Sequence, residues 1–177
     1  MGPGTRPDQT ILREAKPGDA EAVSALVTSL APLFLADPGD LEAAAPFLAT
    51  VSPEAFRGYL ASDRFRYHVA ESNGELAGVV GVRDHQHLFH LFVAERFHRR
   101  GLAARLWAVA RVAARAAGNP GRFTVNSSRY AIPVYERFGF RATGPEVHKD
   151  GVTFVPMALD EHGASSRGVR RAGDRRP

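Results

Sequence analysis

The chain has 177 residues, of which 44% are hydrophobic and 24% charged, with a net charge of +4, which is the composition of a single globular domain. It contains no cysteine, which excludes disulfides, thiolate zinc sites and a cysteine nucleophile. No apolar run approaches the roughly 18 residues of a membrane span, and the N-terminus lacks the apolar core of a signal peptide. We therefore expect a cytoplasmic protein that does not interact with membranes.

The positive charge is concentrated at the C-terminal end. Residues 161–177 hold five arginines against Glu161 and Asp174, a local balance of +3 that leaves the rest of the chain near neutrality. An Arg/Gly/Ser segment without apolar periodicity is typical of a solvated tail. We interpret residues 161–177 as a disordered Arg-rich tail and residues 1–9 as a flexible lead. This distribution does not favour nucleic acid as a partner.

Residues 10–84 predict a strand, two helical regions and a hairpin. Residues 10–15 form the strand, and residues 16–34 form a helix with apolar positions at helical spacing. The second helical region, residues 41–62, is expected to be interrupted near Pro46 and to restart at Ser52. The apolar period then changes to two, and Asn73-Gly74 is a preferred turn for a hairpin between residues 64–72 and 75–84.

The second half of the domain alternates between strands and helices. We expect strands at 85–94, 122–126, 140–149 and 152–159, the last two joined by an Asp150-Gly151 turn. A long helix at 101–118 has the predicted buried stripe Leu102, Leu106, Val109 and Ala113, and a short helix within 128–139 begins near Ala131. This order lacks the strict alternation of a doubly wound sheet. It predicts a mixed sheet with helices packed on it, in one domain of residues 10–160.

A basic turn leads into the long helix. His98, Arg99 and Arg100 lie where the helix start already carries partial positive charge, which is unfavourable unless an anion binds. Gly101 lets the backbone approach a ligand, and the first N–H groups of a helix lack intrahelical partners. The turn is neither a Walker loop nor a dinucleotide fingerprint. We predict a phosphate or pyrophosphate site; the alternative is a solvated basic turn.

Two motifs resemble the signatures of the Gcn5-related N-acetyltransferases. "HRRGLA" at 98–103 is similar to their coenzyme A loop, Gln/Arg-x-x-Gly-x-Gly/Ala, with His98 at the first position. "SSRYAIPVYERFGF" at 127–140 is similar to the second signature, which is represented here by Ala131, Tyr135, Gly139 and Phe140. The resemblance implies an α/β (α+β) acyl-CoA N-acyltransferase fold. Its central sheet would be mixed and mostly antiparallel, with about seven strands and helices on both faces.

The resemblance also implies an N-acetyltransferase with acetyl-CoA as co-substrate, which acetylates the primary amine of a small molecule by direct attack. The strand before the loop would pair with the pantetheine arm, and Tyr135 would be the general acid that protonates the leaving thiolate. Asn126 and Ser128 would bind the amide arm, although a serine here also suits a helix N-cap. The expected cofactor-binding residues are Leu91, Phe92, Val93, His98, Arg99, Arg100, Gly101, Leu102, Ala103, Asn126, Ser128 and Tyr135.

The general base must come from elsewhere, because Phe89 occupies the position where family members often carry a carboxylate. His87 is the candidate base and His90 a weaker one, since an imidazole titrates in the useful range; each could instead be a structural histidine. Regular strand alternation places His85, His87, Phe89 and Leu91 on one face and Gln86, Leu88 and His90 on the other. No third ligand accompanies His85 and His87, so we expect no metal.

Other functions remain open at this point. The chain could acetylate a protein N-terminus or lysine, sense acyl-CoA without catalysis, or bind RNA through the Arg tail, and it could form a homodimer. The acceptor pocket is expected from residues 31–60, 85–90 and 143–151. Its carboxylates, Asp37, Asp40, Glu42 and Glu54, are few for a polycationic acceptor.

Overall fold

The computed structural model describes residues 10–163. The lead at residues 1–9, and the tail from residue 164 onward, lie outside the described residues. Within residues 10–163, no helix is both long and apolar enough to cross a membrane.

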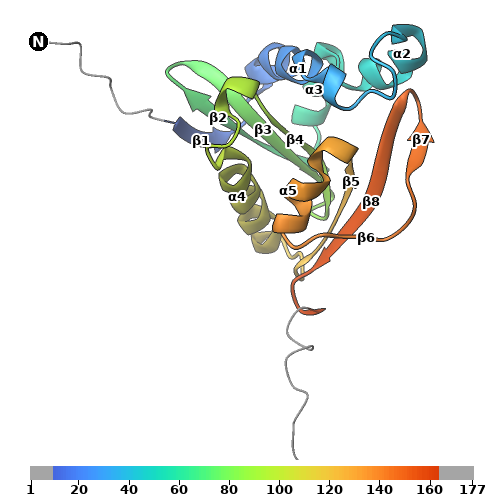
Figure 1. Cartoon of the computed structure of the whole chain (residues 1–177). Helices are drawn as coiled ribbons and strands as arrows, with labels where there is room; N and C mark the ends of the chain where they lie inside the picture. Colours follow the sequence, from blue (N-terminus) through green and yellow to red (C-terminus); the bar gives the residue numbers. More distant parts are fainter. Residues whose placement is uncertain (1–9, 164–177) are drawn as a thin grey trace, which may run out of the picture.

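A single twisted sheet organises the domain (Figure 1). Its strand order is β1-β2-β3-β4-β5-β8-β6, and β7 pairs with β8, so the sheet has eight strands where about seven were predicted. All neighbours are antiparallel except β4 and β5, which confirms the mixed, mostly antiparallel sheet. Helices α1 and α3 cover one face, while α4 and α5 cover the other, and each face has its own apolar core.

The N-terminal half follows the predicted order. β1 (Thr10–Glu14) is followed by α1 (Ala20–Ser29), which has 3₁₀ turns at Pro17–Asp19 and Ala31–Leu33 on either side. α2 (Leu41–Thr50) runs through Pro46, so the predicted interruption there is wrong. Pro46 lies in the second turn, where the helix loses only the hydrogen bond to the Glu42 carbonyl. The break comes at Ser52, whose extended backbone and side chain cap α3 (Pro53–Leu60) through the Ala55 N–H at 3.2 Å.

Three consecutive strands form the centre of the sheet. β2 (Phe65–Ser72) and β3 (Glu75–Arg83) are joined by the predicted turn, in which both Asn73 and Gly74 have positive φ. β4 (His87–Val93) begins two residues later than predicted. Asp84 and His85 both have positive φ, so they turn the chain from β3 into β4 and cannot belong to a strand.

α4 (Leu102–Ala116) starts at Gly101 as predicted, but its buried stripe differs from the predicted one. Val109 and Ala113 are only partly buried, and the fully buried positions are Leu102, Leu106, Trp107, Ala110 and Ala114. The stripe is wider because the Trp107 ring packs against Phe123 on β5 and Phe140 after α5, at ring centroid distances of 4.9 and 5.6 Å. A helix between a sheet and a second helix buries more than one narrow stripe.

The C-terminal half completes the sheet. β5 (Arg122–Ser127) leads through a 3₁₀ turn (Arg129–Ala131) into α5 (Ile132–Arg137), which begins beside Ala131 as predicted. The single strand predicted at 140–149 is instead two short strands, β6 (Arg141–Ala142) and β7 (Val147–Lys149). β8 (Val152–Asp160) pairs with both and with β5.

The β7–β8 turn is docked on the N-terminal helices. Asp150 and Gly151 both have positive φ, as in the β2–β3 turn. The Gly151 carbonyl accepts from the Ala36 N–H at 3.0 Å, and a Cβ at Gly151 would overlap the carbonyl oxygen of Ala43 in α2. This turn therefore closes onto α2 (Figure 1).

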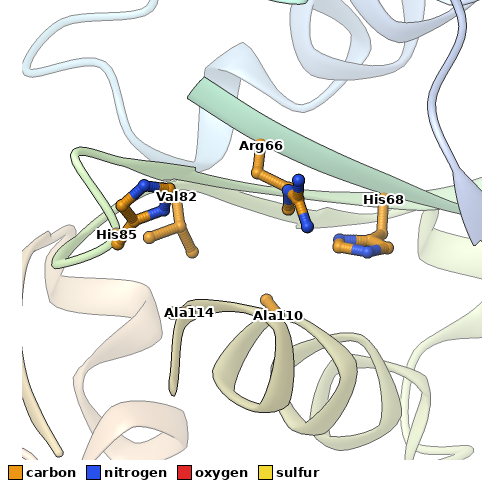
Figure 2. A pocket seen from close by; sticks show the side chains of 6 residues that line it. All are labelled: Arg66, His68, Val82, His85, Ala110 and Ala114. Carbon is orange, nitrogen blue, oxygen red and sulfur yellow. The ribbon is translucent and has the colours of Figure 1, made fainter. Parts of the chain in front are cut away.

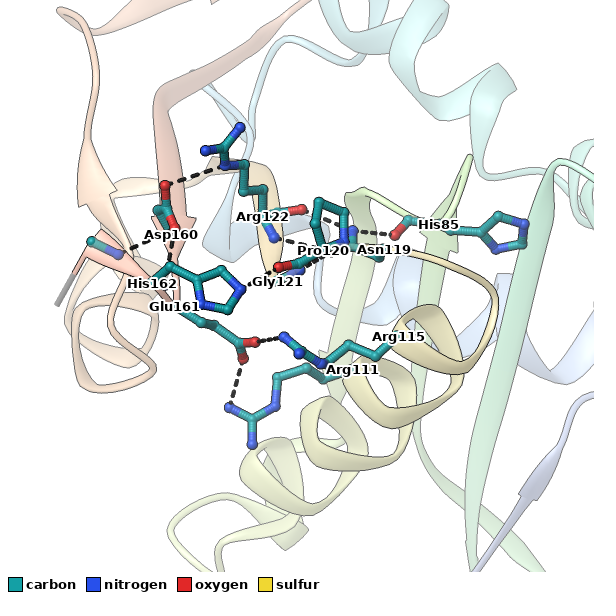
Figure 3. Close-up of polar contacts among 11 residues, drawn as sticks. His85, Arg111, Arg115, Asn119, Pro120, Gly121, Arg122, Asp160, Glu161 and His162 are labelled. Atoms are coloured by element: carbon teal, nitrogen blue, oxygen red, sulfur yellow. Dashed lines mark hydrogen bonds and ion pairs between the residues drawn. The ribbon is translucent and has the colours of Figure 1, made fainter. Parts of the chain in front are cut away.

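The end of β8 is held by a polar network around the α4–β5 connection (Figure 3). Glu161 forms ion pairs with Arg111, at 3.2 Å, and with Arg115, both on the last turns of α4. The Asn119 side chain donates to the His85 and Arg122 carbonyls and accepts from the Gly121 and Arg122 N–H groups. The chain after β8 is thus fixed to the C-terminal end of α4.

Candidate functional site

β4 and β5 separate soon after they meet. Their pairing is limited to His87 with Thr124 and Leu88 with Val125, so the rest of β4 has no strand on that side among the described residues. The Ala94 N–H donates to the Ala77 carbonyl on β3 at 2.9 Å. Because backbone groups alternate along a strand, those of Val93 and Leu91 point away from β3, toward the open edge. The open edge is what an added strand-like ligand requires.

The basic turn has the backbone of an anion site. Arg99 (φ 62°) and Gly101 (φ 73°) are both left-handed, with Arg100 between them in a different conformation. Such alternation directs successive N–H groups toward one point. The Arg105 N–H donates to the Gly101 carbonyl at 3.1 Å at the start of α4, and the space that a side chain at Gly101 would occupy is open.

His98 joins this turn to the strand. Its Nε2 lies 2.7 Å from the Val93 carbonyl oxygen, which can only accept, so Nε2 carries the proton. By contrast, the side chains of Leu102 and Ala103 face the apolar core under α4, with Leu102 fully buried. Among the predicted loop residues, these two can therefore reach a ligand only through their backbone.

A β-bulge in β4 changes which side chains share a face. Gly81 pairs with His90 and Val82 with Leu88, so Phe89 is the extra residue. Two adjacent residues at a bulge can point to the same side. Phe89 and His90 both contact Tyr59 of α3, whereas Leu88 and Leu91 pack in the core under α4. The predicted faces are therefore wrong for Leu91 and His90, because the bulge shifts the alternation by one residue.

His87 lies at the point where the strands separate. Its Nδ1 is 2.8 Å from Thr124 Oγ1 on β5. Burial, and secondarily the Arg83 guanidinium, lower the pKa of His87 below its usual value. The ring is therefore neutral at pH 7, with Nε2 left for another partner.

His90 has a different environment. Its Nδ1 is 2.9 Å from the Tyr67 hydroxyl, and its ring packs among Phe56, Tyr59 and Phe89. Burial, with a smaller contribution from His87, lowers the pKa of His90 to about 3. A group with so low a pKa is a weak base at neutral pH.

Tyr135 lies on the α4 side of the separated strands. It belongs to the apolar core that includes Val93, Leu102 and Leu106, and its ring contacts Phe138 and Phe140. Burial raises the pKa of its phenol, so the hydroxyl stays protonated at neutral pH.

Asn126 and Ser128 are placed differently. Ser128 caps the 3₁₀ turn after β5, accepting from the Ala131 N–H at 3.3 Å, so the capping alternative is realised. Asn126 is exposed and lies two residues from Thr124, on the same face of β5. Sequence reasoning missed Thr124, although the buried–exposed alternation of β5 would have placed it beside Asn126.

Comparison with known proteins agrees with this geometry. Residues 34–161 match the family model described as the acetyltransferase (GNAT) domain. The chain belongs to the GNAT acetyltransferases. No protein of curated function matches the sequence.

Solved GNAT structures share the fold at low sequence identity. A GCN5-related N-acetyltransferase from Rhodopseudomonas palustris is 21% identical, with TM-score 0.70, covering 89% of this chain and 99% of that one. The PaiA N-acetyltransferase from Thermoplasma acidophilum, solved with coenzyme A, is 13% identical, with TM-score 0.67 and coverages of 86% and 99%. A spermidine N-acetyltransferase from Vibrio cholerae is 16% identical, with TM-score 0.59 and coverages of 85% and 94%.

One further gap in the GNAT domain lies outside this site. A gap between α4 and the sheet is lined by Arg66, His68, Val82, His85, Ala110 and Ala114, and is too narrow for a water molecule (Figure 2). It lies on the face opposite His87 and Phe89. Within residues 10–163, no three potential metal-ligating side chains come together.

Proposed function

We propose that the protein is an acetyl-CoA-dependent N-acetyltransferase that acetylates the primary amine of a small molecule by direct attack. The observation that carries this proposal is the open edge of β4, whose end is joined by the His98–Val93 hydrogen bond to the left-handed Gly101 turn of α4. The edge suits an extended amide-containing arm, and the turn suits the pyrophosphate to which that arm is attached.

The binding roles follow from the backbone. Leu91 and Val93 offer N–H groups along the open edge, and Phe92 holds the strand between them against β3. The turn from His98 to Ala103 contributes N–H groups, while the side chains of Arg99 and Arg100 supply positive charge for a diphosphate. Asn126 and Ser128 lie beyond the separation point, where Asn126 can contact the amide arm and Ser128 orders the chain behind it.

The two proton-transfer roles are assigned to residues on opposite faces of the sheet. Bound acetyl-CoA supplies the thioester whose acetyl group is transferred to the amine. With Nδ1–H donating to Thr124 Oγ1, the unprotonated Nε2 of His87 accepts the proton that the attacking nitrogen loses. The Tyr135 hydroxyl holds a proton for the departing sulfur, and its raised pKa keeps that proton in place at pH 7. His90 holds Phe89 and Tyr67 in position and takes no part in proton transfer.

An assay of CoA release tests this proposal. The purified protein is incubated with acetyl-CoA and a panel of primary amines, and free thiol is measured, with acetyl-CoA binding determined separately by calorimetry. Amine-dependent thiol release is expected, with one acetylated amine formed per thiol. Binding of acetyl-CoA without transfer to any amine or peptide N-terminus would identify a sensor instead. Absence of binding would overturn the proposal as a whole.

A further inference from the structure

A group of partly buried aromatic rings begins beside His87, at Phe89, on this face of the sheet. The Phe89 ring is 6.3 Å from the His87 ring, 5.4 Å from Tyr59 of α3 and 5.3 Å from Phe65 of β2, measured between centroids. Farther along β4, Phe92 lies 5.5 Å from Phe34, which precedes α2. We call Phe34, Tyr59, Phe65, Phe89 and Phe92 the aromatic face. None of them is fully buried, so each has ring surface left for a ligand.

Fully buried residues hold the aromatic face in place. Phe56 and Tyr67 are at most 3% exposed and pack behind it, together with His90. Rings supported in this way lose little further freedom when a ligand contacts them. The aromatic face is therefore a preformed apolar surface beside His87.

The charge next to this surface is positive. The Arg83 guanidinium lies over the Phe89 ring, 5.2 Å from its centroid. Its nearest carboxylate, Asp84, is 3.7 Å away and also pairs with Arg64 at 2.7 Å, so one negative charge serves two cations. A further cation placed beside Arg83 and the Phe89 ring would be repelled.

Most carboxylates of the surrounding segments have a hydrogen-bond or ion-pair partner. Asp37 and Asp40 accept from the Gly39 and Ala43 N–H groups at the start of α2. Glu54 pairs with Arg57, and Glu146 with Arg129. Glu42 is exposed and lies two positions from the buried Ala44, on the opposite side of α2. None of these five carboxylates makes its hydrogen bond or ion pair with a residue of the aromatic face. The remaining carboxylate of these segments, Asp150, is exposed in the β7–β8 turn.

We infer that the acceptor is a monoamine with an uncharged aromatic or apolar body, and that polyamines are rejected. This inference rests on the proposed function, because it identifies the surface beside His87 as the acceptor side. Burial of an apolar body against the rings favours binding, while an additional ammonium beside Phe89 meets the Arg83 charge, whose carboxylate partner Asp84 is shared with Arg64. Rejection of the wrong substrate thus comes from an incompletely neutralised positive charge as well as from a lack of attraction.

Two matched pairs of amines test the inference. Hexylamine and 1,6-diaminohexane have the same carbon chain and differ by one ammonium, while phenethylamine and ethylamine differ by the ring. We expect kcat/KM to favour hexylamine by about tenfold or more and phenethylamine over ethylamine by a similar factor. Equal or better use of the diamine, or no benefit from the ring, would overturn the inference.

Arg83→Gln tests the origin of the discrimination. The variant should reduce the preference for hexylamine over the diamine by about threefold or more. Arg66→Gln is the matched control, since Arg66 lies on the neighbouring strand but faces α4 (Figure 2), and it should leave the preference unchanged. If both variants change the preference equally, the cause is general charge and the role of Arg83 is refuted.

Binding separates this inference from the proposed function. The same four amines are titrated into the CoA-loaded protein by calorimetry, which requires no chemistry. Tighter binding of hexylamine and phenethylamine without any acetyl transfer would support the acceptor class while contradicting the proposed function. Transfer to the diamine in preference to hexylamine would support the function while contradicting the acceptor class.

Discussion

His87 on β4 and Thr124 on β5 are hydrogen-bonded to each other, Nδ1 to Oγ1 at 2.8 Å, at the first of the two positions where these strands are paired. The contact fixes the plane of the imidazole and directs Nε2 away from β5. We therefore assign Thr124 as a positioning residue for the proposed base.

Thr124→Val should lower kcat about fivefold, the effect of one lost hydrogen bond, with KM for acetyl-CoA unchanged. Thr124→Ser should restore the rate, because it retains the hydroxyl. In a His87→Ala background, Thr124→Val should have no further effect, since the group it positions is absent. Additive losses in the double variant would refute the coupling.

Tyr135→Phe should keep acetyl-CoA affinity and lower turnover by about 10²–10⁴-fold. The ring and its contacts with Phe138 and Phe140 remain, while the proton for the departing sulfur is lost. Phe138→Leu, on the same helix, controls for packing. A wild-type rate for Tyr135→Phe across the pH range would make Tyr135 a packing residue only.

Gly101→Glu should weaken acetyl-CoA binding by about two orders of magnitude, because it puts a carboxylate in the open space at the anion turn. Gly118→Glu is the control, since Gly118 also has a positive φ and open surroundings but follows the other end of α4. Both variants place a side chain at a positive φ, so the melting temperature should fall in both. Calorimetric titration should show the binding loss only at Gly101, and equal affinities would contradict the assignment of the turn.

Gly151→Ala should displace the β7–β8 turn from α2, because the new Cβ would overlap the Ala43 carbonyl. We expect a loss of about 2 kcal/mol in the free energy of unfolding and a raised KM for the amine, with acetyl-CoA affinity retained. Gly74→Ala lies in a turn of the same conformation with no neighbour within 4 Å, and should cost about 1 kcal/mol. A KM unchanged by Gly151→Ala would show that this turn does not border the acceptor side.

His90 should make the protein sensitive to acid. In the unfolded chain a histidine protonates as the pH falls through about 6.5, whereas the folded protein keeps His90 neutral down to about 3. Between these values the unfolded chain binds more protons, so the free energy of unfolding falls with the pH, by about 2 kcal/mol at pH 5. The stability contribution is complete above pH 6.5.

A double variant isolates this effect. Tyr67→Phe/His90→Phe removes the imidazole together with the hydroxyl that it partners, while Tyr67→Phe alone keeps the titrating group. Denaturant unfolding at pH 7 and pH 5 should show a smaller difference for the double variant by about 2 kcal/mol. The same pH difference in both proteins would mean that His90 does not contribute.

Local chemistry made much of this fold predictable. The turns at Asn73-Gly74 and Asp150-Gly151, the Ser52 cap and the left-handed Gly101 each depend on one or two residues whose conformational preferences are intrinsic. The order of strands and helices could be predicted from apolar periodicity, because this periodicity is also a property of each local segment. The residues proposed for the cofactor loop could be identified from the sequence because they are consecutive in the chain.

Features that depend on distant partners were not predictable in this way. The bulge at Phe89 arises from how β4 registers with β3, so the sequence of β4 alone implied the wrong faces for Leu91 and His90. Trp107 is buried because β5 and α5 both reach it. The contact between His87 and Thr124 joins two strands 37 positions apart in the chain, and a single-sequence pattern contains no information on such a pairing.

The ion pairs of Glu161 with Arg111 and Arg115 also determine which end of the protein is suitable for attachment to a surface. These arginines lie near the C-terminal end of α4, whereas Gly101 lies at its beginning, and fifteen helical residues span about 22 Å. A surface anchor or a fluorescent reporter joined directly after residue 163 would therefore start at the end of the helix remote from the anion turn. Immobilisation through that end, rather than through β1, is the orientation we would choose for sensor-chip measurements of ligand binding.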